Sequence, residues 1–162
     1  MFPRPLLQKA ELLLDRVRDA GLKIVTAESC TGGLIAACLT EIASSSDVVE
    51  RGFVTYSNEA KIELLHVPAD LIAKHGAVSE PVARAMVEGA FAHSLADLAV
   101  SVTGVAGPDG GTAAKPVGLV HFASARRGQA IFHEQRQFGE IGRNQVRLTS
   151  VKVGLEILGQ RL

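Results

Sequence analysis

Two side chains that could together perform acyl transfer follow two β-rich segments of the chain. Ser29 comes directly after residues 22–28, and its hydroxyl is a candidate nucleophile. A serine hydroxyl attacks poorly unless a neighbouring base takes its proton. Lys61 lies one helical turn beyond the second β-rich segment, residues 48–56, and a lysine removed from water has a lowered pKa that suits it to this task. The alternative for Lys61 is an ordinary surface side chain.

Tyr56 is the only tyrosine of the chain and closes the segment 48–56. Its hydroxyl is placed to relay a proton or to donate to an oxyanion, and the alternative is a tyrosine packed at a strand end. The segment around Ser29, AESCTGG, is not the G-x-S-x-G elbow of α/β-hydrolases, because Ala27 and Thr31 occupy the glycine positions. A Ser–Lys pair is therefore the hypothesis to test.

Residues 31–43 are expected to form a helix whose first turn is Thr31, Gly32 and Gly33. Backbone N–H groups at a helix start are unpaired and can hold a phosphate or an oxyanion. Glycines allow a ligand to approach the backbone closely. The alternative is that Ser29 or Thr31 merely caps the helix.

The segment 103–116, TGVAGPDGGTAAKP, is the most unusual in composition. It matches neither a Walker A loop nor a GxGxxG fingerprint, so it is only weak evidence for phosphate binding. Thr103 precedes it at the end of a predicted strand and is expected to face the same pocket as Ser29, and Lys115 is placed to close the loop over an anion. The glycines expected to line the pocket are Gly104, Gly107, Gly110 and Gly111.

Arg143 and Arg147 lie one turn apart near the start of the last predicted helix, 141–160. One of them is placed to reach an anionic group of a substrate, and the alternative is an exposed helix start. Arginines at this end of a helix oppose its dipole, so a compensating anion is expected. We interpret a further group of arginines as solvated surface: Arg126, Arg127 and Arg136.

Helical and strand patterns alternate along the chain. The pattern predicts an α/β fold, a three-layer α/β/α sandwich with a mixed, mostly parallel sheet, in one domain over 1–162. Ligands of open α/β sheets bind beyond the carboxyl ends of the strands, where the three segments above converge. The predicted helices are 5–20, 31–43, 57–65, 68–75, one capped by Ser79, and 141–160; the strands are 22–28, 48–56, 97–103 and a hairpin around Arg127-Gly128.

Composition narrows the function classes. Apolar residues make up 47% of the 162 residues, and 17 basic residues balance 17 acidic ones. A nucleic-acid binder usually has a basic excess, so nucleic acid is not an expected partner. No apolar run is long enough to span a membrane or to form a signal peptide, which predicts a cytoplasmic protein without a membrane partner. The spacing of Cys30 and Cys38 and of the five histidines predicts no metal site.

Five motifs occur in one order along the chain: TAESCTGGLIAACLT, GFVTYSNEAK, GAVSEPVARAM, TGVAGPDGGTAAKPVG and FGEIGRNQVR. Together they resemble the C-terminal domain of the competence/damage-inducible protein CinA, from about residue 5 to 160. That family includes stand-alone nicotinamide-nucleotide amidases, which hydrolyse the carboxamide of nicotinamide mononucleotide to nicotinate mononucleotide and ammonia. Pyridine-nucleotide salvage is one use of this chemistry.

The resemblance implies a role for each matching residue and no metal or organic cofactor. Ser29 matches the nucleophile and Lys61 the general base, with Tyr56 as its polar neighbour and Thr103 and Arg143 as further active-site positions. The resemblance also implies a small-molecule nucleotide as the substrate. It suggests a homodimer, with which the apolar content and the few aromatic residues are compatible. Asp109 departs from the GPGGG pattern of the loop and faces either solvent or the pyridinium charge. A non-catalytic nucleotide-binding module and an amidase for another carboxamide remain the alternatives.

Overall fold

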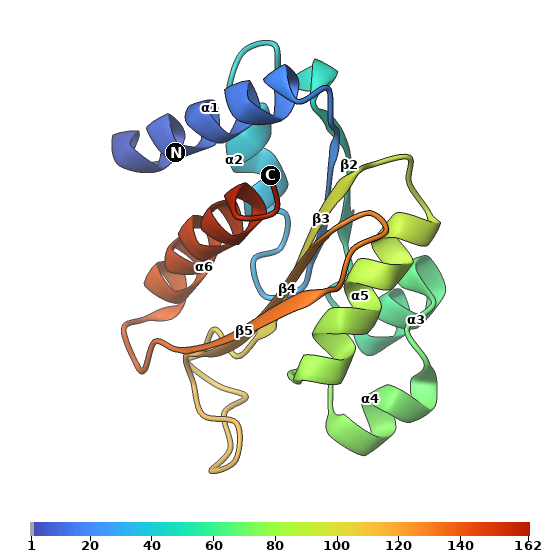
Figure 1. Cartoon of the computed structure of the whole chain (residues 1–162). Helices are drawn as coiled ribbons and strands as arrows, with labels where there is room; N and C mark the ends of the chain where they lie inside the picture. The colour runs from blue at the N-terminus through green and yellow to red at the C-terminus, as the bar shows by residue number, and fades with distance from the viewer. Residues whose placement is uncertain (1) are drawn as a thin grey trace.

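A computed structural model describes residues 2–162 as six α-helices, a short 3-10 helix and five strands (Figure 1). The elements follow the predicted order along the chain. They are α1 (Arg4–Asp19), β1 (Ile24–Glu28), α2 (Leu34–Thr40), η1 (Ser45–Asp47), β2 (Val49–Val54), α3 (Asn58–Leu65), α4 (Ala69–His75), α5 (Glu80–Ala92), β3 (Leu98–Gly104), β4 (Leu119–Arg126), β5 (Phe132–Gln137) and α6 (Arg143–Gly159).

The five strands form one mixed sheet in the order β2-β1-β3-β4-β5. Strands β1, β2 and β3 are parallel, whereas β4 is antiparallel to both β3 and β5, so that four of the five strands point the same way. The predicted hairpin around Arg127-Gly128 is confirmed as β4–β5 at one edge. Glu28 pairs with Val54 on one side and Val102 on the other, which brings the carboxyl ends of the three parallel strands together.

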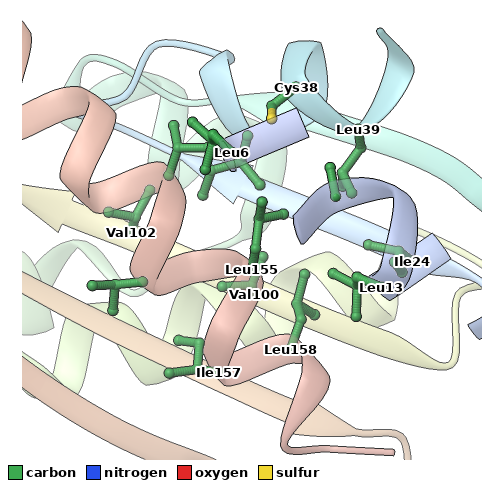
Figure 2. Close-up of a cluster of buried hydrophobic side chains, with 14 of the residues drawn as sticks. Leu6, Leu13, Ile24, Cys38, Leu39, Val100, Val102, Leu155, Ile157 and Leu158 are labelled. Atoms are coloured by element: carbon green, nitrogen blue, oxygen red, sulfur yellow. The ribbon is translucent and has the colours of Figure 1, made fainter. Parts of the chain in front are cut away.

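Helices cover both faces of the sheet, which confirms the predicted three-layer α/β/α sandwich (Figure 1). Helices α1, α2 and α6 pack on one face, where Leu13, Leu155 and Leu158 meet Val100 and Ile24 (Figure 2). Helices α3, α4 and α5 cover the other face through a second cluster that includes Leu65 and Met86. Strands β1 and β3 are buried on both faces, as is typical of parallel strands that have helices on both sides of the sheet.

Helix α2 is shorter than the helix predicted over 31–43. It begins only at Leu34, because Gly32 (φ +59°) and Gly33 (φ +94°) adopt left-handed backbone conformations that a helix does not contain. Residues 29–33 instead form a tight turn, closed by a 2.9 Å hydrogen bond from the Gly32 N–H to the Ser29 carbonyl. The turn, and not the helix, thus follows directly on β1.

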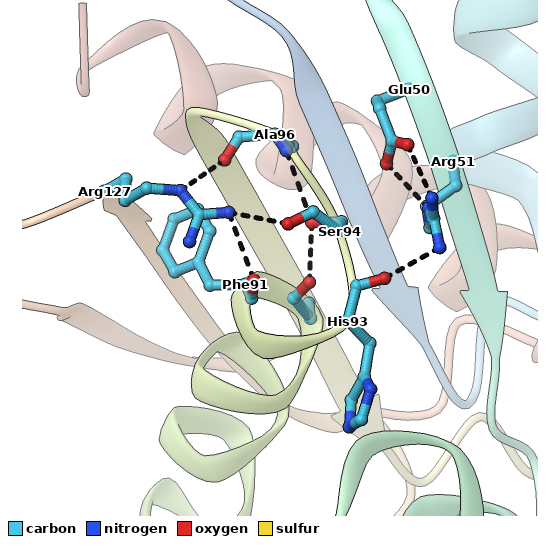
Figure 3. Close-up of polar contacts among 8 residues, drawn as sticks. Glu50, Arg51, Phe91, His93, Ser94, Ala96 and Arg127 are labelled. Atoms are coloured by element: carbon cyan, nitrogen blue, oxygen red, sulfur yellow. Dashed lines mark hydrogen bonds and ion pairs between the residues drawn. The ribbon is translucent and has the colours of Figure 1, made fainter.

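Arg127 is exposed as predicted, but it also holds the connection between α5 and β3. Its guanidinium donates to the carbonyls of Phe91, Ser94 and Ala96 at 3.1, 2.9 and 2.8 Å (Figure 3). Beside it, Arg51 on β2 donates to the His93 carbonyl and pairs with Glu50. A cation near a helix C-terminus stabilises the free carbonyls there, so these arginines fix the end of α5 against the sheet.

None of the helices within residues 2–162 is both long enough and apolar enough to cross a bilayer.

Candidate active site

Ser29 lies immediately beyond β1, where the chain leaves the sheet. Its N–H still donates to the Val102 carbonyl of β3 at 3.0 Å, which holds the residue at the strand end. Ser29 is 8% exposed and lines the adjoining cleft. A nucleophile on a hydrogen-bonded turn with limited access to water is a suitable arrangement for acyl transfer.

Lys61 comes from α3 and reaches the hydroxyl of Ser29. Ser57 caps that helix by accepting the Ala60 N–H at 2.9 Å, which sets the first turn so that Lys61 points inward. The Lys61 Nζ lies 3.0 Å from Ser29 Oγ and 2.9 Å from the Thr55 carbonyl, with the Tyr56 and Ser57 carbonyls at 3.4 Å. The two residues predicted to form a nucleophile–base pair are therefore in hydrogen-bond contact.

Burial makes the charged form of Lys61 less favourable than it is for a lysine in water. The side chain is 1% exposed, and within residues 2–162 its hydrogen-bond partners are all uncharged oxygens. Burial lowers the pKa of Lys61 below the ordinary 10.5. A neutral amine has two N–H groups and one lone pair, so two carbonyls can take the N–H groups while the lone pair accepts the hydroxyl proton of Ser29.

Cys30 is a second potential nucleophile beside Ser29, and it is excluded by its environment. Burial raises the pKa of the Cys30 thiol to about 12. Because the thiolate and not the thiol is nucleophilic, Cys30 remains unreactive near neutral pH. Both Cys30 and Cys38 are free and buried, and within residues 2–162 no three His, Cys, Asp or Glu side chains converge as metal ligands do.

A cleft of about 520 Å³ opens over Ser29 and Lys61 at the carboxyl ends of the parallel strands. Most of the residues predicted for the site line it. They are Ser29, Tyr56, Lys61, Thr103, Gly104, Gly107, Gly110 and Arg143. The larger groove between α1 and α6, about 700 Å³, contains none of the predicted site residues.

Tyr56 and Arg143 close one side of the cleft together. The guanidinium of Arg143 donates to the Tyr56 hydroxyl at 2.8 Å and to the Gly107 carbonyl at 2.9 Å. It therefore joins the end of β2, the glycine-rich loop and the start of α6. The Tyr56 side chain is 58% exposed and turned to Arg143, so only its backbone carbonyl contacts Lys61. The structure thus shows no direct path for the proton relay that the sequence hypothesis gave to the Tyr56 hydroxyl.

Thr103 lies at the end of β3 and lines the cleft, but its hydroxyl already donates a hydrogen bond to the backbone. Thr103 Oγ1 donates to the Ala77 carbonyl at 2.9 Å, in the connection before α5. The amide N–H groups of Cys30 and Thr31, in contrast, donate to no backbone or side-chain oxygen among the described residues. Of these two residues only Cys30 lines the cleft, so its amide is the donor that is available to an oxyanion there.

The glycine-rich loop supplies backbone to the cleft, and its lysine is used elsewhere. Gly107 (φ +79°) and Gly110 (φ +86°) take left-handed conformations that allow the loop to fold over Ser29. Asp109 also lines the cleft, while its side chain is exposed. The Nζ of Lys115 donates to the His75 carbonyl at the end of α4, so it anchors the loop to that helix and does not close it over an anion.

Thr31, Gly32, Gly33 and Gly111 were predicted to bind substrate, and the structure places them outside the lining of the cleft. The anion site expected at the start of α2 is already occupied. The Glu28 carboxylate accepts the N–H groups of Ile35 and Ala36 at 2.9 and 2.8 Å, so these donors are not free for a phosphate. Arg147 likewise donates to the Thr31 carbonyl at 3.0 Å and supports the turn from outside.

Sequence reasoning did not single out Glu28, Asn58, Ala77 or Val78, of which the last three line the cleft. The one signal for Glu28 was an acidic residue at the end of an otherwise apolar strand, directly before the candidate nucleophile. Asn58 and Ala77 carry no such signal, because the packing of α3 and α5 against the sheet brings them to the cleft.

The chain matches a model of the CinA C-terminal domain over residues 7–162. It is 46% identical to the nicotinamide-nucleotide amidohydrolase PncC of Escherichia coli K12 over 162 residues, covering 99% of this chain and 97% of that protein. It is 60% identical over 111 residues to a putative competence-damage inducible protein of Symbiobacterium thermophilum, covering 68% of this chain but only 26% of that longer protein.

Among solved structures, the competence/damage inducible protein CihA of Agrobacterium tumefaciens superposes with a TM-score of 0.96 at 49% identity. The match covers 98% of this chain and 96% of that one. Sequence and fold agree over nearly the whole length, including every element that builds the cleft. The chain belongs to the CinA C-terminal domain family.

Proposed function

We propose that this chain is a serine amidohydrolase that converts nicotinamide mononucleotide to nicotinate mononucleotide and ammonia. The observation that carries the proposal is the 3.0 Å contact between the buried amine of Lys61 and the hydroxyl of Ser29. A binding module gains nothing from burying a lysine against a serine, whereas an acyl-transfer enzyme needs this pair. The name of the E. coli relative supports the choice of substrate.

In the first step, neutral Lys61 takes the proton of Ser29 while Oγ attacks the carboxamide carbon. A bond forms between Oγ and that carbon, and the carbonyl oxygen becomes an oxyanion beside the Cys30 amide. The Lys61 ammonium then gives its proton to the amide nitrogen, the C–N bond breaks and ammonia leaves. The product of this half-reaction is an ester of Ser29.

In the second step, Lys61 takes a proton from water, whose oxygen attacks the ester carbon. The bond to Ser29 breaks, the proton returns to Oγ and the carboxylic acid leaves. A general base of this kind contributes about 10²–10⁴-fold to the rate, and an oxyanion donor about 10²–10³-fold. Arg143 is the cation at the rim of the cleft, and it is the group we assign to the phosphate of the nucleotide.

The test is ammonia release from nicotinamide mononucleotide by the wild type and by the Ser29→Ala and Lys61→Met variants. Lys74→Met is the matched control, because Lys74 is an exposed lysine on α4 away from the cleft. We expect turnover to be lost in the first two variants and retained in the control, with all four proteins folded by circular dichroism. Saturable binding without turnover by the wild type would instead favour the nucleotide-binding module. If the wild type hydrolyses only a different carboxamide, the proposed amidase activity stands but the proposed substrate is wrong.

A further inference from the structure

Glu28 is a buried carboxylate that satisfies four hydrogen-bond donors. It is the last residue of β1 and is 0% exposed. One carboxylate oxygen accepts from the Thr26 hydroxyl at 3.2 Å and the Ala36 N–H at 2.8 Å. The other accepts from the Thr31 hydroxyl at 2.6 Å and the Ile35 N–H at 2.9 Å. A buried carboxylate persists only when its oxygens are paired in this way.

Glu28 also connects the two halves of the Ser–Lys pair through its backbone. Ser29 follows it directly in the chain. The Glu28 carbonyl accepts the Thr55 N–H at 2.8 Å, and the Thr55 carbonyl in turn accepts from Lys61 Nζ at 2.9 Å. The side chain therefore fixes the turn that carries the nucleophile, while the backbone fixes the strand end that holds the base.

We propose that Glu28 is the positioning residue for Ser29, which it holds in line with Lys61 by clamping the Ser29–Gly33 turn through the hydroxyl of Thr31. The inference rests on the proposed Ser–Lys mechanism. It also gives Thr31 a new role, because its hydroxyl points to Glu28 and is not among the groups lining the cleft. The near-attack arrangement of a nucleophile is sensitive to shifts of about 1 Å, which can cost about 10²-fold in rate.

The competing explanation is that Glu28 only caps helix α2 and stabilises the fold. The two threonines separate these explanations, since each donates one hydroxyl hydrogen bond to the same buried carboxylate. Thr26 lies within β1 and is fully buried, whereas Thr31 belongs to the turn of the nucleophile. Thr26→Val and Thr31→Val remove the same kind of bond, but only the second frees the turn.

The experiment compares the purified wild type with Thr31→Val, Thr31→Ser and Thr26→Val. For each protein, kcat and KM are measured with nicotinamide mononucleotide, and the rate of Ser29 modification by a fluorophosphonate is followed by mass spectrometry. Melting temperatures report the structural cost. The fluorophosphonate loses fluoride as Ser29 Oγ bonds to phosphorus, so it reads the positioning of the nucleophile independently of the nucleotide.

We expect Thr31→Val to lower kcat and the rate of Ser29 modification by about tenfold or more, with KM little changed. Thr31→Ser should restore kcat and the rate of Ser29 modification, and Thr26→Val should match the wild type in these two quantities. The two valine variants should have similarly lowered melting temperatures. Equal losses in Thr26→Val and Thr31→Val, or none in either, would overturn the inference and leave Glu28 a structural cap.

Glu28→Gln is a second variant that preserves size. An amide has one acceptor oxygen, so in either orientation its NH₂ group faces the N–H of Ile35 or Ala36 and leaves it unpaired. We expect a loss of kcat at least as large as in Thr31→Val. If the fluorophosphonate modifies Ser29 of the wild type but the wild type releases no ammonia from nicotinamide mononucleotide, only the proposed substrate is wrong, and the variants still decide the role of Glu28. If the wild type neither reacts with the fluorophosphonate nor releases ammonia, both proposals are overturned.

Discussion

The amine of Lys61 lies 3.0 Å from the hydroxyl of Ser29, although 32 residues separate them in the chain. Two parallel strands bring them together, because β1 ends before Ser29 and β2 ends shortly before the helix that carries Lys61. The lysine has no acidic partner among its hydrogen-bond contacts. The burial of Lys61 and its contact with a serine hydroxyl are the observations on which the proposed mechanism rests.

The pH dependence of turnover should follow Lys61. A general base works in its neutral form, so kcat/KM should rise with pH and level off above the pKa of the free enzyme's Lys61. Because burial lowers that pKa, the midpoint should fall below 10.5. The measurement is a pH profile of kcat/KM, with Lys61→Arg as the control that keeps the positive charge but cannot give up its proton. A midpoint at the ordinary lysine value, or an active Lys61→Arg, would argue against this base.

Tyr56→Phe should affect substrate binding more than chemistry. The hydroxyl of Tyr56 accepts from Arg143 and does not contact Ser29 or Lys61, so its loss loosens the arginine at the rim. We expect KM for nicotinamide mononucleotide to rise about two- to tenfold, the worth of one hydrogen bond, with kcat retained. Steady-state kinetics decide this. A fall in kcat at constant KM would restore the proton relay that the sequence hypothesis gave to this residue.

Gly89→Ala should destabilise the protein and reduce turnover. Gly89 on α5 packs against α3, and an added Cβ would clash with the Leu65 carbonyl oxygen at the end of α3. The displaced helix carries Lys61. We expect a loss of about 1–3 kcal/mol in the free energy of unfolding, measured by urea denaturation, together with lower kcat in the remaining folded protein. Gly159→Ala is the control, because its added Cβ meets no atom closer than 3.4 Å.

Cys30 should resist alkylation in the native protein despite its position in the cleft. Its thiol pKa of about 12, against the ordinary 9.0, lowers the thiolate fraction near neutral pH by about 10³-fold. Iodoacetamide should therefore react with Cys30 only after denaturation, and treatment of the native enzyme should leave ammonia release unchanged. Peptide mass spectrometry after timed exposure measures this. Rapid labelling at neutral pH would show that the thiol is ionised.

The fold class and the proximity of Ser29 and Lys61 could both be predicted from the sequence. Alternating helix and strand patterns predict parallel strands, and residues after parallel strands share one edge of the sheet. The turn of Gly32 and Gly33 was less predictable, because the same residues are compatible with a helix start. Only the positive φ angles of the two glycines separate the turn from α2.

Side-chain direction accounts for what sequence patterns could not predict. The hydroxyl of Tyr56 accepts a hydrogen bond from Arg143, which lies 87 residues later in the chain. Lys115 donates to the carbonyl of His75, which lies 40 residues earlier. Such contacts depend on how α4 and α6 pack, which no local pattern encodes. The role of Glu28 was the hardest to predict from sequence, because its carboxylate accepts hydrogen bonds from a helix that begins six residues later in the chain.

The most direct test of the Ser29–Lys61 mechanism is to quench the wild-type protein during turnover of nicotinamide mononucleotide and analyse its peptides by mass spectrometry. The mechanism predicts that the peptide containing Ser29 carries the nicotinate mononucleotide acyl group, and that folded Ser29→Ala neither forms this adduct nor releases ammonia. Release of ammonia by folded Ser29→Ala at the wild-type rate, with no modified peptide in the wild type, would contradict it.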